Sequence, residues 1–226
     1  PTMRRIVGIG IYSSGRLLVR NVSMLVLMRL AAGFGTAALA AFGLCFRLQM
    51  VLFGPTMGFS MAAATLTGQN LGARDPRRAR RGGWTAAGFA VAIAAALGAV
   101  YWFGAPVIVP VFNDAPDVVR YGTSLLRWLA PTFVFLSLTM VLSFAMNGAG
   151  DTLRPMILTG VSLFVFGIPL AVLLVELWGR AEGVWVGMAA THVMSGVLAV
   201  LAFHLGPWVR IGLEHADREE GDSDRR

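Results

Sequence analysis

The feature that most constrains this chain is the run from Trp84 to Ile108, which contains no charged side chain. A helix rises about 1.5 Å per residue, and about 20 mostly apolar residues cross the hydrocarbon core of a bilayer. A run of this length and composition therefore predicts a membrane-spanning helix. The whole chain fits a membrane protein, because 56% of its residues are hydrophobic and only 14% are charged, which leaves too little polar surface for a water-soluble domain.

Other apolar runs of similar length bring the number of predicted spans to six, in an all-α, polytopic membrane protein. The predicted spans are residues 17–38, 39–66, 84–108, 121–146, 156–175 and 184–205. The first is the weakest, because it contains Arg20, Asn21 and Arg29. We expect residues 1–16 to be a cytoplasmic lead-in, residues 17–209 to form one six-helix transmembrane lobe, and residues 210–226 to be a disordered, charged cytoplasmic tail.

The arginines are distributed unequally between the two sides of this predicted topology. Six spans place both termini on one side, together with the loops after the second and fourth spans. The arginines of that side are Arg4, Arg5, Arg16, Arg20, Arg74, Arg77, Arg78, Arg80, Arg81, Arg154, Arg210, Arg218, Arg225 and Arg226, and those of the other side are Arg120, Arg127 and Arg180. The positive-inside rule then predicts cytoplasmic termini in a plasma (cell inner) membrane. The net charge of +7 thus reflects topology, and no nucleic-acid partner is expected, because the arginines form no single polar face.

The titratable residues argue against an enzyme. An integral-membrane enzyme would need His, Asp and Glu side chains clustered at the membrane face. His192 and His204 lie on the last predicted span, and His215 lies in the tail. No metal site and no cofactor are expected, and the single cysteine, Cys45, cannot form an intrachain disulfide.

Four motifs carry a resemblance to a known family. They are Gly35-Thr36-Ala37-Ala38-Leu39-Ala40-Ala41, Pro55-x-x-Gly58-x-x-x-Ala62 continuing to Gly68-Gln69-Asn70-Leu71-Gly72-Ala73, Asn147-Gly148-Ala149-Gly150-Asp151-Thr152 with Pro155, and Gly183-Val184-Trp185. In this order and spacing, the chain resembles the C-terminal six-helix half of a multidrug and toxic compound extrusion (MATE) transporter.

The resemblance implies a twelve-helix transporter of two six-helix lobes, with a cavity between them. It implies secondary active antiport, in which organic compounds and drugs, with organic cations as the expected substrates, leave in exchange for Na⁺ or H⁺. The implied partners are the N-terminal six-helix lobe of the same protein, the lipid bilayer and small organic cations. Two alternatives stay open, a lipid-linked precursor flippase of the same superfamily and a non-transporting structural membrane subunit.

Candidate site residues fall on the second and fourth predicted spans and, for Asn147, directly after the fourth. The substrate-path candidates are Gln49, Met50, Phe53, Met57, Met140 and Asn147. Flexible methionines suit a surface that accepts many ligands, although ordinary packing explains them equally.

A helix kink is expected at the Gly54-Pro55 pair, because proline removes one intrahelical hydrogen bond. Gly54 and Gly58 would permit close helix approach at this bend. The kink is interpreted either as a static packing feature or as a gating element in alternating access.

Three arginines, Arg29, Arg47 and Arg127, are expected inside the membrane. Each could snorkel to the outer interface, pair with an acid of the absent lobe, or contact an anionic substrate group.

The predicted spans contain no Asp or Glu. One branch of the MATE family carries acids in its second lobe, and the matching positions here hold Arg20 and Leu136. Because cation coupling usually needs an intramembrane carboxylate, we expect the coupling acid in the absent N-terminal half. His192 is interpreted as a hydrogen-bonded packing residue, with a proton relay as the alternative.

Overall fold

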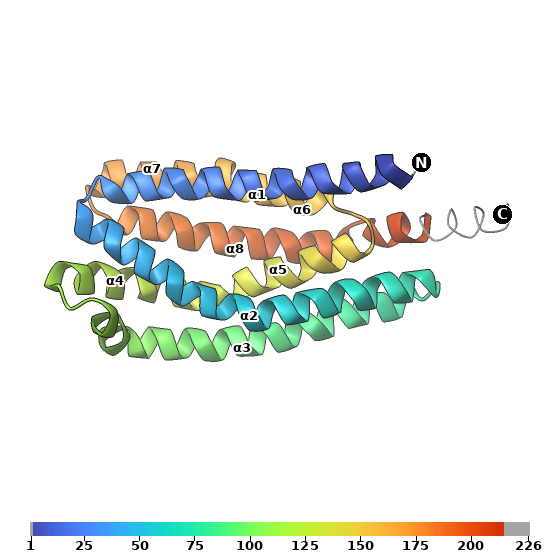
Figure 1. Cartoon of the computed structure of the whole chain (residues 1–226), viewed down its shortest axis with the longest axis horizontal. Helices are drawn as coiled ribbons and strands as arrows, with labels where there is room; N and C mark the ends of the chain where they lie inside the picture. Colours follow the sequence, from blue (N-terminus) through green and yellow to red (C-terminus); the bar gives the residue numbers. More distant parts are fainter. Residues whose placement is uncertain (1, 215–226) are drawn as a thin grey trace.

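The computed structural model describes residues 2–214, and the side chains of residues 15 and 18–214. Long helices run side by side and form an elongated bundle (Figure 1). All the regular secondary structure of the described residues is helical. The all-α fold expected from the sequence is therefore confirmed.

The elements follow one another with short connections. They are α1 (Thr2–Ala32), α2 (Thr36–Gly72), α3 (Pro76–Phe112), α4 (Pro116–Leu129), the 3₁₀ segment η1 (Ala130–Thr132), α5 (Phe133–Gly148), α6 (Leu153–Gly160), the π-helical segment η2 (Val161–Gly167), α7 (Ile168–Trp178) and α8 (Glu182–Leu205). The segment from α4 to α5 is one continuous rod, and so is the segment from α6 to α7.

Within the described residues, five rods are long and apolar enough to cross a membrane. They are Thr36–Gly72, Pro76–Phe112, Pro116–Gly148, Leu153–Trp178 and Glu182–Leu205, and each contains or closely matches one predicted span. The remaining predicted span coincides with α1, which has the length but not the composition of the others. Helix α1 runs along the bundle beside α6 and α7 (Figure 1). A sixth crossing stays a prediction, because α1 is not among the rods that are apolar enough to cross a membrane.

The structure differs from the sequence-based boundaries at both ends of the chain. Residues 2–16, expected as a separate lead-in, belong to α1. The first turn falls at residues 33–35 rather than near residue 38. In this turn Gly35 adopts a φ of 99°, a conformation that favours glycine. Residues 210–214 of the expected tail are helical rather than disordered, in a short helix that starts at Trp208. Trp208 holds this helix in place because it is fully buried and stacks on Phe203 with ring centroids 4.6 Å apart. Residues 215–226 of the expected tail lie outside the described residues.

Small residues let the helices cross closely. A Cβ atom added to Gly148 on α5 would lie 2.2 Å from the carbonyl oxygen of Ala64 on α2. A Cβ atom added to Gly187 on α8 would lie 2.5 Å from the Cβ of Ala171 on α7. These approaches are the backbone-to-backbone packing that glycine and alanine permit between membrane helices.

The buried side chains form two separate clusters. The first gathers around Phe133 and Trp185, toward the end of the bundle that holds the α1–α2 turn. The second gathers around Leu71, Phe203 and Trp208, toward the α2–α3 turn (Figure 1). Along α2, α5 and α8, the middle of each helix lies between these two clusters.

Candidate functional site

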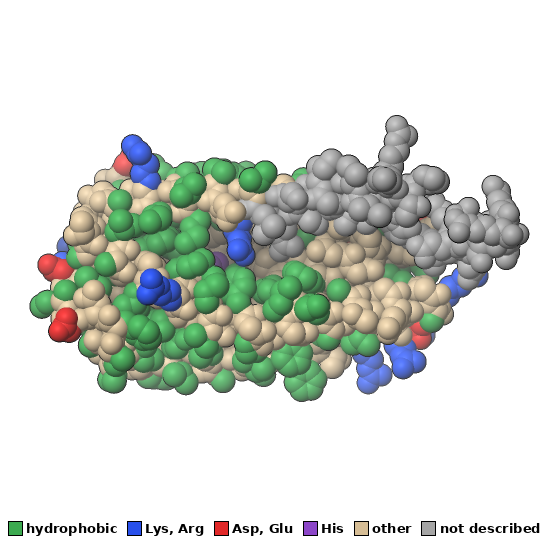
Figure 2. Space-filling view, in the orientation of Figure 1, with side chains coloured by type: hydrophobic (Ala, Val, Ile, Leu, Met, Phe, Trp, Pro, Cys, Tyr) green, Lys and Arg blue, Asp and Glu red, His purple; other side chains and the backbone are tan. Residues whose placement is uncertain are grey.

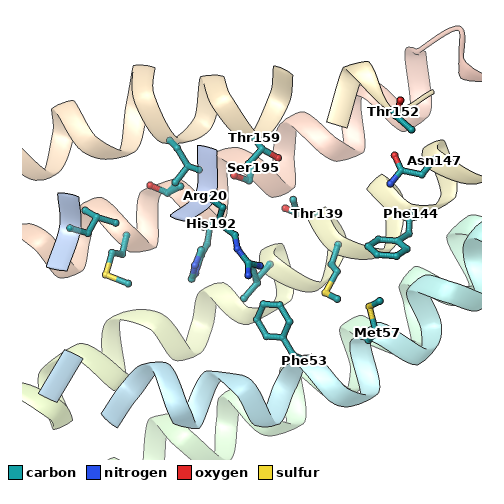
Figure 3. Close-up of a pocket in the computed structure, with 16 residues that line it drawn as sticks. Arg20, Phe53, Met57, Thr139, Phe144, Asn147, Thr152, Thr159, His192 and Ser195 are labelled. Carbon is teal, nitrogen blue, oxygen red and sulfur yellow. The ribbon is translucent and has the colours of Figure 1, made fainter. Parts of the chain in front are cut away.

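A cavity of about 600 Å³ lies between the two buried clusters. Its lining residues come from α1, α2, α5, α6, η2 and α8 and from the turn before α6 (Figure 3). They are Arg20, Leu27, Phe53, Met57, Leu136, Thr139, Met140, Phe144, Asn147, Thr152, Thr159, Leu163, Met188, Thr191, His192 and Ser195. The volume is within the range of about 300–1,000 Å³ that small-molecule sites occupy.

Helical periodicity explains why these residues share one space. On α8, Met188, Thr191, His192 and Ser195 line the cavity at spacings of three, four and seven residues, which brings them onto one helix face. On α5, the lining residues from Leu136 to Asn147 follow the same period. The sequence singled out His192 on this face but did not group it with Met188 and Ser195, although polar residues at this spacing on an apolar helix were the signal that could have found the whole face.

Four of the six substrate-path candidates are brought together in the cavity. Phe53 and Met57 point into it from α2, and Met140 and Asn147 line it from α5 (Figure 3). Gln49 and Met50 do not line it. Gln49 is buried one turn before Phe53, where α2 contributes to the first buried cluster. Whether the four lining residues form a substrate path stays a prediction.

The expected discontinuity of α2 lies beside the cavity. Pro55 lies inside α2, and the helix bends in its middle part (Figure 1). The expectation that Gly54 and Gly58 permit close helix approach is wrong within this lobe, because an added Cβ atom at either position would meet no atom within 4 Å. Both glycines and Pro55 are exposed, so these positions do not pack closely against the described helices.

The three arginines expected inside the membrane lie outside the cavity. Arg29 is in the last turn of α1, where it can reach a membrane interface. Arg127 is in the last turn of α4, inside the continuous rod Pro116–Gly148. Arg47 is on α2, and all three side chains are exposed. A different arginine, Arg20, extends from α1 into the cavity (Figure 3). Its guanidinium carbon lies 5.7 Å from the centroid of the Phe53 ring, which is cation–π geometry.

His192 is held by a hydrogen bond across the bundle. Its Nδ1 atom lies 2.9 Å from Thr132 Oγ1, and this hydroxyl donates to Leu129 O at 2.7 Å. Since a threonine hydroxyl has a single proton, Nδ1–H of His192 is the donor to Thr132. The neutral ring then presents Nε2 as an acceptor. This bond is the packing interaction predicted for His192, although the ring also borders the cavity.

The described lining residues include no Asp or Glu. No group of three or more His, Cys, Asp and Glu that could hold a metal ion occurs in the described part of the chain. Asp151 lies in the α5–α6 turn, directly before the lining residue Thr152, and is 4% exposed. It pairs with the Arg154 guanidinium and accepts a hydrogen bond from Arg154 N at 3.3 Å, so it stabilises the start of α6 rather than facing the cavity.

Comparisons with known proteins agree with this architecture. The chain is 30% identical over 207 residues to the probable multidrug resistance protein NorM of Rhodopseudomonas palustris, covering 89% of this chain and 44% of that protein. It is 23% identical over 203 residues to the probable multidrug resistance protein YpnP of Bacillus subtilis, covering 90% of this chain and 45% of that protein. The chain therefore spans about half the length of the curated relatives that it matches.

Solved structures show the same fold. The structure of the MATE transporter ClbM in complex with Rb⁺ superimposes with a TM-score of 0.87 at 23% identity, covering 94% of this chain and 50% of that one. The eukaryotic MATE transporter AtDTX14 superimposes with a TM-score of 0.80 at 25% identity, covering 92% of this chain and 48% of that one. The MatE family model matches residues 14–173, which is more than half of the sequence. The resemblance seen in the motifs is confirmed, and this chain belongs to the MatE family of membrane transporters.

Proposed function

We propose that this chain is the second six-helix lobe of a twelve-helix secondary antiporter, which exports organic compounds in exchange for Na⁺ or H⁺. Family membership and the coverage of about half of each relative support this proposal. Relatives whose names describe probable multidrug resistance proteins support efflux as the direction. Members of the family are transporters rather than enzymes.

The observation that carries the proposal is the cavity in the middle of the bundle. It separates two well-packed clusters, so the helices are held at both ends and leave a ligand-sized space between. Its lining combines apolar and methionine side chains with a few polar groups, as in sites that accept organic molecules. Methionine thioethers adapt to ligands of different shape.

We propose a plasma-membrane orientation with both termini of this chain in the cytoplasm. The two ends of the described chain and the α2–α3 turn lie at the same end of the bundle (Figure 1). This end carries Arg74, Arg77, Arg78, Arg80 and Arg81 around the turn. The excess of arginine at one end supports a cytoplasmic position by the positive-inside rule.

The coupling acid is expected in the first lobe. A carboxylate that exchanges Na⁺ or H⁺ is the usual device for coupling to a cation gradient, and the described lining residues of this lobe include none. Attraction of an organic cation by a fixed negative charge would likewise have to come from the first lobe.

Transport by the full-length protein in proteoliposomes tests this function. The transporter is reconstituted with its cytoplasmic face outward, and a fluorescent organic solute is added outside the proteoliposomes. A Na⁺ gradient or a pH gradient is then imposed in separate experiments. The proposal predicts uptake that requires one of the gradients and that collapses with the matching ionophore. Flipping of a labelled lipid without solute exchange would favour the flippase alternative, and absence of both activities would favour a structural subunit. Either result would contradict the proposed antiport.

A further inference from the structure

The charge of the cavity is the starting point. Arg20 is the only residue with a permanent charge among the described residues that line it, and His192 is the other titratable residue. The described lining contains no carboxylate. A positive charge that faces an apolar, partly enclosed space attracts anions more strongly than it would in water. In Figure 2, hydrophobic side chains border a hollow on this face of the molecule, with basic side chains within it.

The guanidinium of Arg20 has N–H donors that can bind an anion. Within the described part of the chain, its one close interaction is the contact of the guanidinium with the Phe53 ring at 5.7 Å. Among the residues that the structure describes, no hydrogen bond or ion pair to a protein group engages the N–H groups of this guanidinium, so they are available to a ligand. A planar guanidinium binds carboxylate, sulfonate or phosphate oxygens through two parallel N–H bonds.

Four of the other polar residues that line the cavity present acceptors to it. The hydroxyls of Thr139, Thr159 and Thr191 donate to carbonyl oxygens of their own helices at 2.7–2.8 Å. Each of these hydroxyls therefore presents only lone pairs to the cavity. His192 presents Nε2 as an acceptor, because Nδ1–H is donated to Thr132. Arg20, on the α1 side, is thus the one permanently cationic donor among the described lining residues. Asn147, Thr152 and Ser195 add neutral groups that can both donate and accept, and the threonine and histidine acceptors lie on the walls formed by α5, α6 and α8 (Figure 3).

We propose that this cavity binds amphipathic organic anions. The acidic group of the ligand is held by Arg20 above Phe53, and its apolar body lies against the wall formed by Met57, Leu136 and Met140. Donor groups on the ligand, such as a hydroxyl or an amine, pair with the threonine oxygens opposite. This inference rests on the proposed transport function and specifies its substrate class, which differs from the organic cations implied by the family resemblance.

Equilibrium binding to the full-length protein in nanodiscs tests the proposal. Two probes share one fluorescent aromatic body, an anthracene, and differ in carrying either a carboxylate or a trimethylammonium group. We expect the wild type to bind the carboxylate more tightly than the ammonium. Loss of a charge-assisted bond in Arg20→Gln should weaken carboxylate binding by about tenfold to a hundredfold, and Arg20→Lys should retain part of the affinity because it keeps the charge but not the planar fork.

Arg29→Gln is the matched control, because it removes the same charge from the same helix at a position outside the cavity. Carboxylate affinity should be unchanged in this variant. Thermal melting of each variant in detergent checks that the protein is folded. A wild type that prefers the ammonium probe would overturn the proposal, and so would equal losses in Arg20→Gln and Arg29→Gln. If Arg20→Gln lowered thermal stability but kept the carboxylate preference, Arg20 would be a structural partner of an acid in the first lobe, and the proposal would be wrong.

Binding and transport fail in distinguishable ways. A protein that binds the carboxylate through Arg20 but exchanges no solute under any gradient would refute the proposed antiport and support the anion site. Gradient-driven export of the ammonium probe, without Arg20-dependent carboxylate binding, would do the reverse. A third probe that carries the carboxylate on a long alkyl chain in the bilayer distinguishes a membrane-borne from a water-borne anion, and Arg20-dependent binding of either supports the site.

Discussion

The substitution Gly148→Ala tests whether the close crossing of α2 and α5 holds this lobe together. Gly148 is the last residue of α5, and the carbonyl oxygen of Ala64 on α2 would lie 2.2 Å from an added Cβ atom. The reverse contact is also tight, because a Cβ atom on Gly68 would lie 3.1 Å from Gly148 O. In both cases the atom that an added Cβ would meet is a backbone carbonyl oxygen, so no side-chain rotation can relieve the contact.

The structure gives the size of the effect. Ordinary van der Waals contact begins at 3.4 Å, so the two helices must separate by about 1.2 Å at the crossing. A gap of about 0.5–1 Å already forfeits a quarter to a half of the dispersion energy of the atoms involved. Overpacking of this kind costs about 1–3 kcal/mol. For a chain of this size, about 2–4 °C of melting temperature is lost per kcal/mol, so we expect a decrease of several degrees.

Thermal unfolding of the purified protein in detergent measures this decrease. A thiol-reactive fluorogenic maleimide is a suitable reporter, because Cys45 is buried and becomes reactive only on unfolding. The matched control is Gly88→Ala, which makes the same change inside α3 where an added Cβ atom meets nothing within 4 Å. We expect the control to melt at or slightly above the wild-type temperature, since alanine favours a helix by about 1 kcal/mol over glycine. Equal melting temperatures for Gly148→Ala and Gly88→Ala would refute the close-crossing explanation.

Pro55→Ala restores the missing hydrogen-bond donor of α2 and should slow transport and shift inside/outside accessibility if the bend takes part in gating; unchanged transport would identify a static kink. Thr132→Val leaves Nδ1–H of His192 unpaired and should cost about 1–3 kcal/mol, whereas Thr139→Val, whose hydroxyl bonds only within α5, should cost less; melting curves compare the two variants. Trp208→Phe removes a 2.7 Å hydrogen bond to a backbone carbonyl and should cost about 0.5–1.5 kcal/mol, and a melting temperature equal to that of the wild type would contradict this.

The sequence predicted the membrane fold well, because apolar length is a local property. The uncharged run at 84–108 became the middle of α3, and the runs at 156–175 and 184–205 lie inside the rods that end the bundle. The boundaries were less predictable. The α1–α2 turn depends on the positive φ of Gly35, and residues 208–214 are helical because Trp208 finds a partner in Phe203, which no local pattern indicates.

The candidate site was predicted only in part. Phe53, Met57, Met140 and Asn147 line the cavity and were candidates from residue type and position, because flexible or polar side chains within or at the end of a span suggest a ligand-facing surface. Arg20 was assigned to the cytoplasmic side by its place in the chain. Its position in the cavity depends on the rotation of α1 against its neighbours, which single-sequence patterns do not determine. The failure at Gly54 and Gly58 has the same origin, since a glycine does not reveal which face of its helix meets a partner.

Whether α1 crosses the membrane with the other helices is the claim on which the lobe, its cavity and Arg20 all depend. Single cysteines at Thr2 and Phe34, introduced in turn into the full-length protein with Cys45 and any other native cysteine replaced by alanine, mark the two ends of this helix. Labelling of intact cells with a membrane-impermeant maleimide should reach Phe34→Cys from outside and should reach Thr2→Cys only after permeabilisation. Labelling of both positions from the same side of the membrane would contradict a crossing by α1 and remove Arg20 from the transport pathway.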